Sequence, residues 1–332
     1  MNNDRTFIIA ELSANHNNDL DLALRTIDSV AETGADAIKV QTYRPESLAL
    51  NVDNEFFGPK KEGLWKGIRP YDLYKEAALP YEWHKPLKDR AEKHGLIFFS
   101  SPFDLEAVDF LEELNVPLYK IASFEITDIQ LIKYTASKGK PMIISTGVAS
   151  VEDIQLAVDA CREVGNNDIT LLKCTSQYPA TIDDANLITI PNIKEKFDVK
   201  VGVSDHTMGD IVPTTAVALG AKVVEKHYIL DRKLGGPDSS FSMEPEEFKQ
   251  LVDRVRQVEK TLGYVKYDIN EKDIYKRRSL FATQDISEGE LFTEKNIRSL
   301  RPGIGLHPKF YESILNTPSK ISYKKGDPIK NE

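Results

Sequence analysis

Polar and charged residues recur in this chain at one kind of place, the end of a short apolar segment. Eight segments show this pattern, among them FIIAEL, LIFFSS, PMIIST and ITLLKC. The polar residues at their ends are Glu11, Lys39, Gln41, Ser100, Ser101, Lys120, Ser123, Ser145, Thr146, Lys173, Thr175, Ser204, Asp205, His206, Glu225 and His227. Together they offer cations for an anion, carboxylates for proton transfer and imidazoles for a metal ion. We therefore expect an enzyme site that several segments build together.

Two histidines are the candidates for a metal site. His206 and His227 end the expected seventh and eighth strands, and neighbouring strands would bring their imidazoles within reach of one divalent ion. Each could instead only hydrogen-bond at the rim of the fold. The flanking Asp205 and Glu225 favour a metal or acid–base role for the pair. The remaining histidines lie in helical or loop patterns and are weaker candidates: His16, His84, His94 and His307.

Three lysines are candidates for an anion cradle. Lys39, Lys120 and Lys173 follow apolar residues, and nearby serine and threonine hydroxyls would help them to bind a phosphate or carboxylate. No P-loop is present, so a nucleoside triphosphate is not implied. Lys120 or Lys173 could alternatively form a Schiff base, although neither has an obvious lysine neighbour that would activate it. The candidate carboxylates for proton transfer or sugar hydroxyls are Glu11, Glu125, Asp205, Glu225 and Asp238.

The segments that must position these residues alternate between two periods. Strands are expected at 7–12, 37–43, 96–101, 118–123, 141–146, 169–174, 199–205 and 222–229, with helices at 18–33, 104–114, 150–164 and 244–261. This alternation predicts repeated βα units and a parallel sheet. A doubly wound open sheet would also alternate, but no GxGxxG follows any strand. Eight units favour a closed (β/α)₈ barrel of the α/β class, whose C-terminal face carries the chemistry.

The chain is longer than a bare barrel requires, which is about 250 residues. We expect a barrel over residues 1–262, a charged connector over 263–278 and a small domain over 279–332. A module of that size is marginal alone, so it should dock onto the barrel or a partner subunit. The long connection over 44–80, which contains Phe56, Trp65 and Tyr74, predicts an ordered flap over the barrel mouth.

Composition excludes several function classes. A hydrophobic content of 41% is enough for a sizeable core, and the net charge of −9 argues against nucleic acid as a partner. No apolar run approaches the roughly 20 residues that span a bilayer, and MNNDRTF lacks a secretory pattern. Cys161 and Cys174 lie in apolar patterns and are expected to be buried thiols. We therefore expect a cytoplasmic protein without a membrane partner.

Seven motifs resemble, in order, those of the sialic acid synthase family: AELSANH, IKVQTY, FSSPFD, YKIASFEI, LLKCTSQYP, VGVSDHT and VVEKHYILDR. The stretch LFATQDISEGELFTEKNIRSLRPGIG is similar to that family's SAF domain, which resembles type III antifreeze protein. The resemblance implies a TIM barrel with a C-terminal SAF (β-clip) domain. It also implies condensation of phosphoenolpyruvate with an open-chain N-acetylated amino sugar, aided by a divalent ion, commonly Mn²⁺, with Mg²⁺ or Co²⁺ as alternatives.

The same resemblance implies roles for individual residues. His206 and His227 match the metal ligands of the family, and Glu125 matches the favoured proton-transfer group. The positions that hold phosphoenolpyruvate are matched by Lys39, Ser101, Lys120, Ser123, Ser176 and Ser204, and the other sugar-side or catalytic positions by Glu11, Tyr178 and Asp238. Arg301 matches an arginine that the SAF domain of one subunit inserts into the barrel of the other. This implies a domain-swapped homodimer.

Within the family, PYDLYKEA, FSSPFD, EKHYILDR and GGPDSSFS are most similar to the members that make pseudaminic acid. The implied sugar is 2,4-diacetamido-2,4,6-trideoxy-L-altrose, whose methyl group would suit the apolar residues of 44–80. One alternative is the same reaction giving N-acetylneuraminic or legionaminic acid, and another is a metal-dependent pyruvate aldolase that releases no phosphate. A sugar-binding or ice-binding protein is the non-enzymatic alternative, but it would need few of these polar groups.

Overall fold

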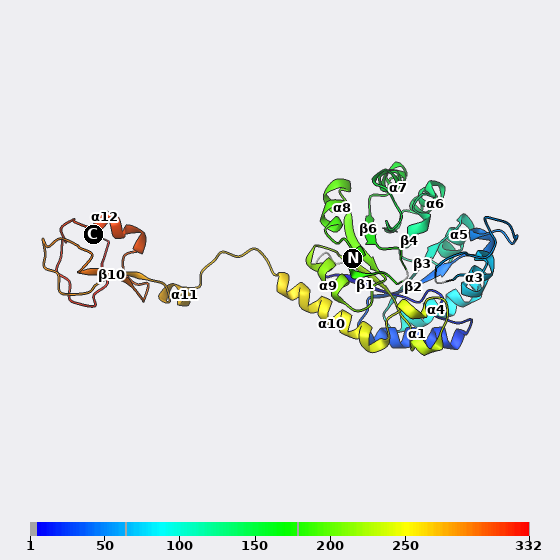
Figure 1. The fold of residues 1–332 in the computed structure, drawn as a ribbon, viewed down its shortest axis with the longest axis horizontal. Helices are drawn as coiled ribbons and strands as arrows, with labels where there is room; N and C mark the ends of the chain where they lie inside the picture. Colours follow the sequence, from blue (N-terminus) through cyan, green and yellow to red (C-terminus); the bar gives the residue numbers. More distant parts are fainter. Residues whose placement is uncertain (1–4, 64, 178, 332) are drawn as a thin grey trace. The chain divides into compact units, whose positions relative to one another are not determined.

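Eight parallel strands close into a barrel, in which each strand pairs with its neighbours in the chain and β1 pairs with β8. The computed structural model describes residues 5–63, 65–177 and 179–331 (Figure 1). The strands are β1 (Phe7–Glu11), β2 (Ala37–Thr42), β3 (Ile97–Pro102), β4 (Tyr119–Ile121), β5 (Met142–Ser145), β6 (Ile169–Cys174), β7 (Lys200–Asp205) and β8 (Val223–His227). The predicted (β/α)₈ barrel is confirmed.

Helices surround the ring of strands (Figure 1). They are α1 (Leu20–Thr33), α4 (His84–Lys93), α5 (Leu105–Glu113), α6 (Ile129–Ala136), α7 (Val151–Glu163), α8 (Thr189–Phe197), α9 (Ile211–Ala218) and α10 (Pro245–Leu262). Short 3₁₀ turns are η1 (Tyr81–Trp83), η2 (Ser123–Glu125), η3 (Ile182–Asp184), η4 (Arg232–Leu234) and η5 (Ser239–Phe241). Local sequence defines the helix starts: the Ser150 side chain and Asp153 form a capping box at α7, and Pro245 occupies the first turn of α10.

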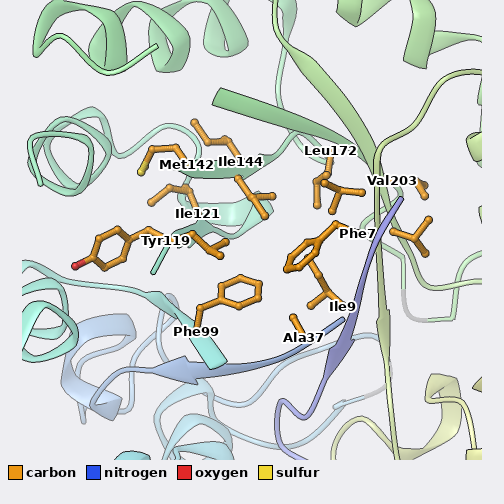
Figure 2. Packing of buried hydrophobic residues seen from close by; sticks show 14 of the residues in the cluster. Phe7, Ile9, Ala37, Phe99, Tyr119, Ile121, Met142, Ile144, Leu172 and Val203 are labelled. Carbon is orange, nitrogen blue, oxygen red and sulfur yellow. The ribbon is translucent and has the colours of Figure 1, made fainter. Parts of the chain in front are cut away.

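The barrel interior changes from apolar to polar along each strand. Side chains alternate across a strand, so Ile9 and Glu11 share one face of β1, as Ala37 and Lys39 do on β2. Phe7, Ile9, Ala37 and Phe99 belong to one buried cluster and lie close together in Figure 2. These apolar side chains form a floor, and the next inward positions of β1, β2 and β3 are polar: Glu11, Lys39 and Ser101. The fold therefore places a ring of polar groups at the C-terminal mouth, above a closed apolar core.

The connection after β2 is partly helical. It contains α2 (Pro45–Leu48) and α3 (Pro70–Ala77), and the α3 end is bonded to the loop after β1 through Asn18 Nδ2 and Glu76 O (3.0 Å). The Tyr74 ring lies edge-on to Tyr43, with 6.3 Å between the ring centroids. Phe56, between the two helices, is 76% exposed. The α3 part is thus ordered against the mouth-side loops, as predicted for a flap, whereas the Phe56 ring is not packed.

Residues 264–332 form a second compact unit with its own core. The strands β9 (Ser279–Ala282) and β10 (Ile297–Leu300) pair antiparallel, and the helices are α11 (Glu271–Tyr275), η6 (Pro308–Phe310) and α12 (Tyr311–Ile314). The buried cluster of this unit comprises Leu280, Ala282, Ile286, Phe292, Ile297, Tyr323 and Ile329. Helix α11 lies inside the stretch expected to be a simple connector. Among the described helices, none is long and apolar enough to cross a membrane.

Candidate active site

The mouth of the barrel holds a buried network of two lysines and two carboxylates. Lys39 Nζ lies 2.7 Å from Glu11 Oε2 and 3.9 Å from Glu225 Oε2, and it donates to Ser101 Oγ at 3.3 Å. Lys120 Nζ lies 3.5 Å from Glu225 Oε1, which also accepts from Ser204 Oγ at 3.1 Å. All of these side chains are buried. Side chains from six different strands therefore converge at one point, and two of the three lysines expected for an anion cradle, Lys39 and Lys120, are among them.

Burial and neighbouring charges set the protonation of this network. Burial raises the pKa of Glu11 to about 7, against the opposing charge of Lys39. Burial alone would also raise the pKa of Glu225, but the charges of Lys120 and Lys39 hold it below its usual value. Burial lowers the pKa of Lys120. Glu225 is thus the anionic centre that both ammonium groups share, and Glu11 titrates near neutral pH.

A second group of hydroxyls lies beside Lys120, where β4, β5 and β6 end. Gly147 N donates to Ser123 Oγ at 3.2 Å, and a Cβ added at Gly147 would lie 2.0 Å from Ser176 Oγ. A Cβ at this position would displace the Ser176 hydroxyl, and no sequence pattern singled out Gly147. Cys174 Sγ, 3.7 Å from Ser176 Oγ, also faces this corner. Both cysteines are buried free thiols, as expected, but the inward position of Cys174 was not predicted.

The two candidate imidazoles are neighbours. The ring centroids of His206 and His227 are 5.2 Å apart, and Phe241 lies edge-on to both rings. His206 Nδ1 lies 3.0 Å from the Thr175 carbonyl, which can only accept, so Nδ1 carries the proton. Burial, helped by the charge of His206, holds the pKa of His227 well below its usual value, and its Nδ1 is buried without a hydrogen-bond partner.

This pair fits a divalent ion that takes its other ligands from water or substrate. A neutral imidazole is the form that binds metal, and a buried ring nitrogen without a partner is available for such a bond. Across the ranges that the structure describes, no three His, Cys, Asp or Glu side chains are grouped to hold an ion by themselves. The protein ligands would thus be His206 and His227 alone.

Two further carboxyl groups flank the mouth. Asp238 Oδ2 lies 3.8 Å from His227 Nδ1 and accepts from Ala14 N at 3.3 Å, and burial raises its pKa. Burial raises the pKa of Glu125 to about 7, against the charge of Lys120, and its Oε2 is buried without a hydrogen-bond partner. A carboxyl group that is half protonated at neutral pH suits general acid–base catalysis.

Several expected site residues lie elsewhere. Asp205 follows the inward-facing Ser204, and Lys173 precedes the inward-facing Cys174. Because side chains alternate along a strand, Asp205 and Lys173 face out of the barrel. Asp205 pairs there with Lys226 instead of facing the pocket, and Lys173 Nζ donates to the Cys174 carbonyl, so it cannot join the cradle. The expectation that Lys120 has no lysine neighbour is also wrong, because Glu225 bridges Lys120 to Lys39.

Two of the expected residues are not placed at the barrel mouth by this structure. Tyr178 lies outside the described residues. Arg301 lies in the second unit, directly after β10, and its side chain is exposed. Gln41, which is not among the residues matched to the family's site, donates to Glu11 Oε1 at 3.2 Å and to Ser13 Oγ at 3.0 Å. Its position two residues after Lys39 on the same strand was the signal for an inward side chain.

A model of the NeuB family matches residues 26–267, and a model of the SAF domain matches residues 277–332. The chain belongs to the NeuB family. The predicted sialic acid synthase resemblance, with an SAF tail, is confirmed. A pseudaminic acid synthase of Campylobacter jejuni is 48% identical over 98% of this chain and 96% of its own length. An N,N′-diacetyllegionaminic acid synthase of the same species is 36% identical over 98% of this chain and 99% of its own length.

Solved structures of NeuB relatives share the fold. The crystal structure of an N-acetylneuraminic acid (sialic acid) synthetase from Leptospira borgpetersenii, in complex with citrate, aligns with a TM-score of 0.72 at 38% identity. The alignment covers 82% of this chain and 90% of that chain. In this NeuB-family chain, the lysine network and the imidazole pair therefore occupy the catalytic face of a barrel built like that of a synthetase.

Proposed function

We propose that this chain is a pseudaminic acid synthase that condenses phosphoenolpyruvate with 2,4-diacetamido-2,4,6-trideoxy-L-altrose and releases phosphate. The observation that carries the reaction type is the buried Lys39–Glu225–Lys120 network beside two adjacent imidazoles. The sugar assignment is supported by the higher identity to the pseudaminic acid synthase, 48%, than to the legionaminic acid enzyme of the same species, 36%.

The lysines and hydroxyls bind the anionic substrate. Lys39 and Lys120 would hold the phosphate and carboxylate groups through charge-assisted hydrogen bonds, with Ser101, Ser123 and Ser204 as additional donors. Ser176, whose hydroxyl lies against the backbone of Gly147, would be a further donor. Because these donors are buried and already fixed by one another, binding requires little reorganisation of the site.

The chemistry then requires one proton at the sugar aldehyde. The enol carbon of phosphoenolpyruvate attacks the aldehyde carbon, a C–C bond forms, and the aldehyde oxygen takes a proton from the Glu125 carboxyl group. Water adds to the resulting cationic carbon and gives one proton back to the Glu125 carboxylate, which forms a tetrahedral intermediate. The C–O bond to phosphate then breaks as the new hydroxyl becomes the carbonyl, its proton leaves with phosphate, and the products are a 2-keto acid and phosphate. His206 and His227 would hold a divalent ion, for which we propose Mn²⁺, that polarises the aldehyde oxygen when bound. Asp238 would accept a hydrogen bond from a sugar hydroxyl.

The second unit is proposed to complete the site of another subunit. Arg301 is exposed and cationic, and its insertion into a partner barrel would make the enzyme a domain-swapped homodimer. Two free buried thiols fit a reducing compartment, so we place the enzyme in the cytoplasm.

The direct test is phosphate release from phosphoenolpyruvate with Mn²⁺ in three parallel reactions. The sugars are the 6-deoxy-altro diacetamido compound, its manno analogue and N-acetylmannosamine, and a His206→Ala variant controls for non-enzymatic release. Preference for the altro sugar is expected. Preference for another sugar would retain the reaction but change the substrate, and no release with any sugar by a folded, metal-loaded protein would refute the synthase assignment.

A further inference from the structure

A buried ion pair lies behind the barrel wall, level with the two imidazoles. Asp205 and Lys226 are partners in the register of β7 and β8, directly after the inward-facing pair Ser204 and Glu225. Alternation therefore turns Asp205 and Lys226 outward, away from the cradle. Lys226 Nζ lies 2.5 Å from Asp205 Oδ2, and the two residues are 0% and 3% exposed.

This pair fixes the backbone on both sides of His206. The Lys226 ammonium also donates to the carbonyl oxygen of Thr207. Asp205 in turn accepts from Thr207 N at 3.0 Å through Oδ1 and from Thr207 Oγ1 at 3.1 Å through Oδ2. One ammonium thus holds the residues before and after His206, and the next residue in its own strand is His227. The hydrogen bonds among Asp205, Thr207 and Lys226 therefore connect the backbone that carries His206 to the strand that carries His227.

Stability alone does not explain a charged pair at this position. The preceding outward positions of the two strands are apolar, Val201 and Val203 on β7 and Val224 on β8, and all three are buried. Continuing that apolar row would avoid the desolvation of two charges, and such replacements are often neutral or stabilising. Charge-assisted hydrogen bonds have a directional geometry that valine packing lacks. The pair therefore contributes alignment where the strands end.

We propose that Asp205 and Lys226 are positioning residues for the divalent-ion site, holding His206 at a fixed distance and orientation relative to His227. The inference rests on the metal site of the proposed function. Metal–imidazole bonds have a defined length, about 2.0–2.1 Å for zinc, so two ligands on separate strands need a rigid connection. Loss of the groups that orient a metal ligand typically weakens metal affinity by about 10- to 100-fold.

The test is Mn²⁺ binding to the full-length protein without substrates, followed by the electron paramagnetic resonance signal of free Mn²⁺. The variant is Asp205→Asn combined with Lys226→Met, which removes both charges at nearly constant volume. Its Kd for Mn²⁺ is expected to rise about 10- to 100-fold with an unchanged circular dichroism spectrum. Excess Mn²⁺ should restore synthesis, whereas His206→Ala should not recover. Lys200→Met, which removes the exposed Lys200–Asp168 pair at the other end of β7, should bind like wild type.

The outcomes separate this inference from the proposed function. A folded double variant with the wild-type Kd would overturn the positioning role and leave the metal site in place. Wild-type protein that binds no Mn²⁺ would refute the metal site and the inference together. Should the double variant not fold, Asp205→Asn alone, which keeps an acceptor for Thr207, is measured against the same criterion.

Discussion

Replacing Glu125 by glutamine should remove both the proton and the pH dependence that this carboxyl group gives to the reaction. Glu125 Oε2 is buried without a hydrogen-bond partner, and burial raises the pKa of this carboxyl group to about 7. Glu11 has a similar pKa, but Lys39 and Gln41 already engage its oxygens. Glu125 is therefore the group whose proton is free to move to a substrate oxygen.

The expected magnitude follows from the protonated fraction. With a pKa of about 7, Glu125 is protonated in about half of the molecules at pH 7 and about a tenth at pH 8. Because the protonated form donates, the rate should fall as pH rises through 7, approaching tenfold per pH unit. Glutamine cannot donate a carboxyl proton, so Glu125→Gln should lose about 10²- to 10⁴-fold in rate and also lose this falling limb.

The assay is the initial rate of phosphate release at low concentrations of both substrates, between about pH 6.5 and 9. This range lies above the second pKa of a phosphate ester, about 6, so ionisation of phosphoenolpyruvate does not obscure the limb. Glu11→Gln is the matched variant, because it removes the other carboxyl group with a pKa near 7. A falling limb that persists unchanged in Glu125→Gln but disappears in Glu11→Gln would refute the assignment.

Other perturbations test other parts of the site. Gly147→Ala should lower kcat/KM for phosphoenolpyruvate on the order of 10²-fold, since the new Cβ would lie 2.0 Å from Ser176 Oγ; unchanged steady-state kinetics would contradict the hydroxyl corner. His206→Ala and Arg301→Ala should each be impaired alone, yet purified mixed dimers should regain about half of wild-type activity, because one barrel has both residues. No recovery would exclude the swapped arrangement. In urea titrations, the unfolding free energy of wild type should fall by about 2 to 3 kcal/mol between pH 5 and 8, because the pKa of Glu11 is about 7 in the folded state against 4.5 for a free carboxyl group, so its ionisation weakens the folded state. Glu11→Gln should not show this fall. The same pH dependence of unfolding free energy in both proteins would contradict the prediction.

The sequence predicted the barrel well because its signals are local. Apolar runs identified all eight strands to within a few residues, and capping residues such as Ser150 agree with the helix starts. Lys39, Lys120, His206 and His227 were also recognisable as candidates, because the ends of apolar strands lie at the C-terminal mouth of this fold. The convergence of Lys39 and Lys120 on Glu225 was not predictable, since it depends on the register of β8 against β7 and β1.

Three of the failures, at Lys173, Asp205 and Cys174, share one physical cause, which is the face of the strand on which the side chain lies. Residue type placed Lys173 and Asp205 among the catalytic candidates, yet each is one residue away from an inward-facing neighbour and so lies on the other side of the sheet. The same shift by one residue hid Cys174, which faces the site. Gly147 gave no signal, because its importance arises only where two distant serines approach its backbone.

The two faces of the sheet also explain why β7 ends in two successive polar residues with different partners. Ser204 points inward and bonds to Glu225, which organises the lysines, while Asp205 points outward and bonds to Lys226. The inward pair belongs to the buried lysine network, and the outward pair is connected through Thr207 to the backbone that carries His206. Both pairs join β7 to β8 at successive residues, so the cradle and the imidazoles are held by the same two strands. A change in the spacing of these strands would therefore affect the proposed anion site and the proposed metal site together.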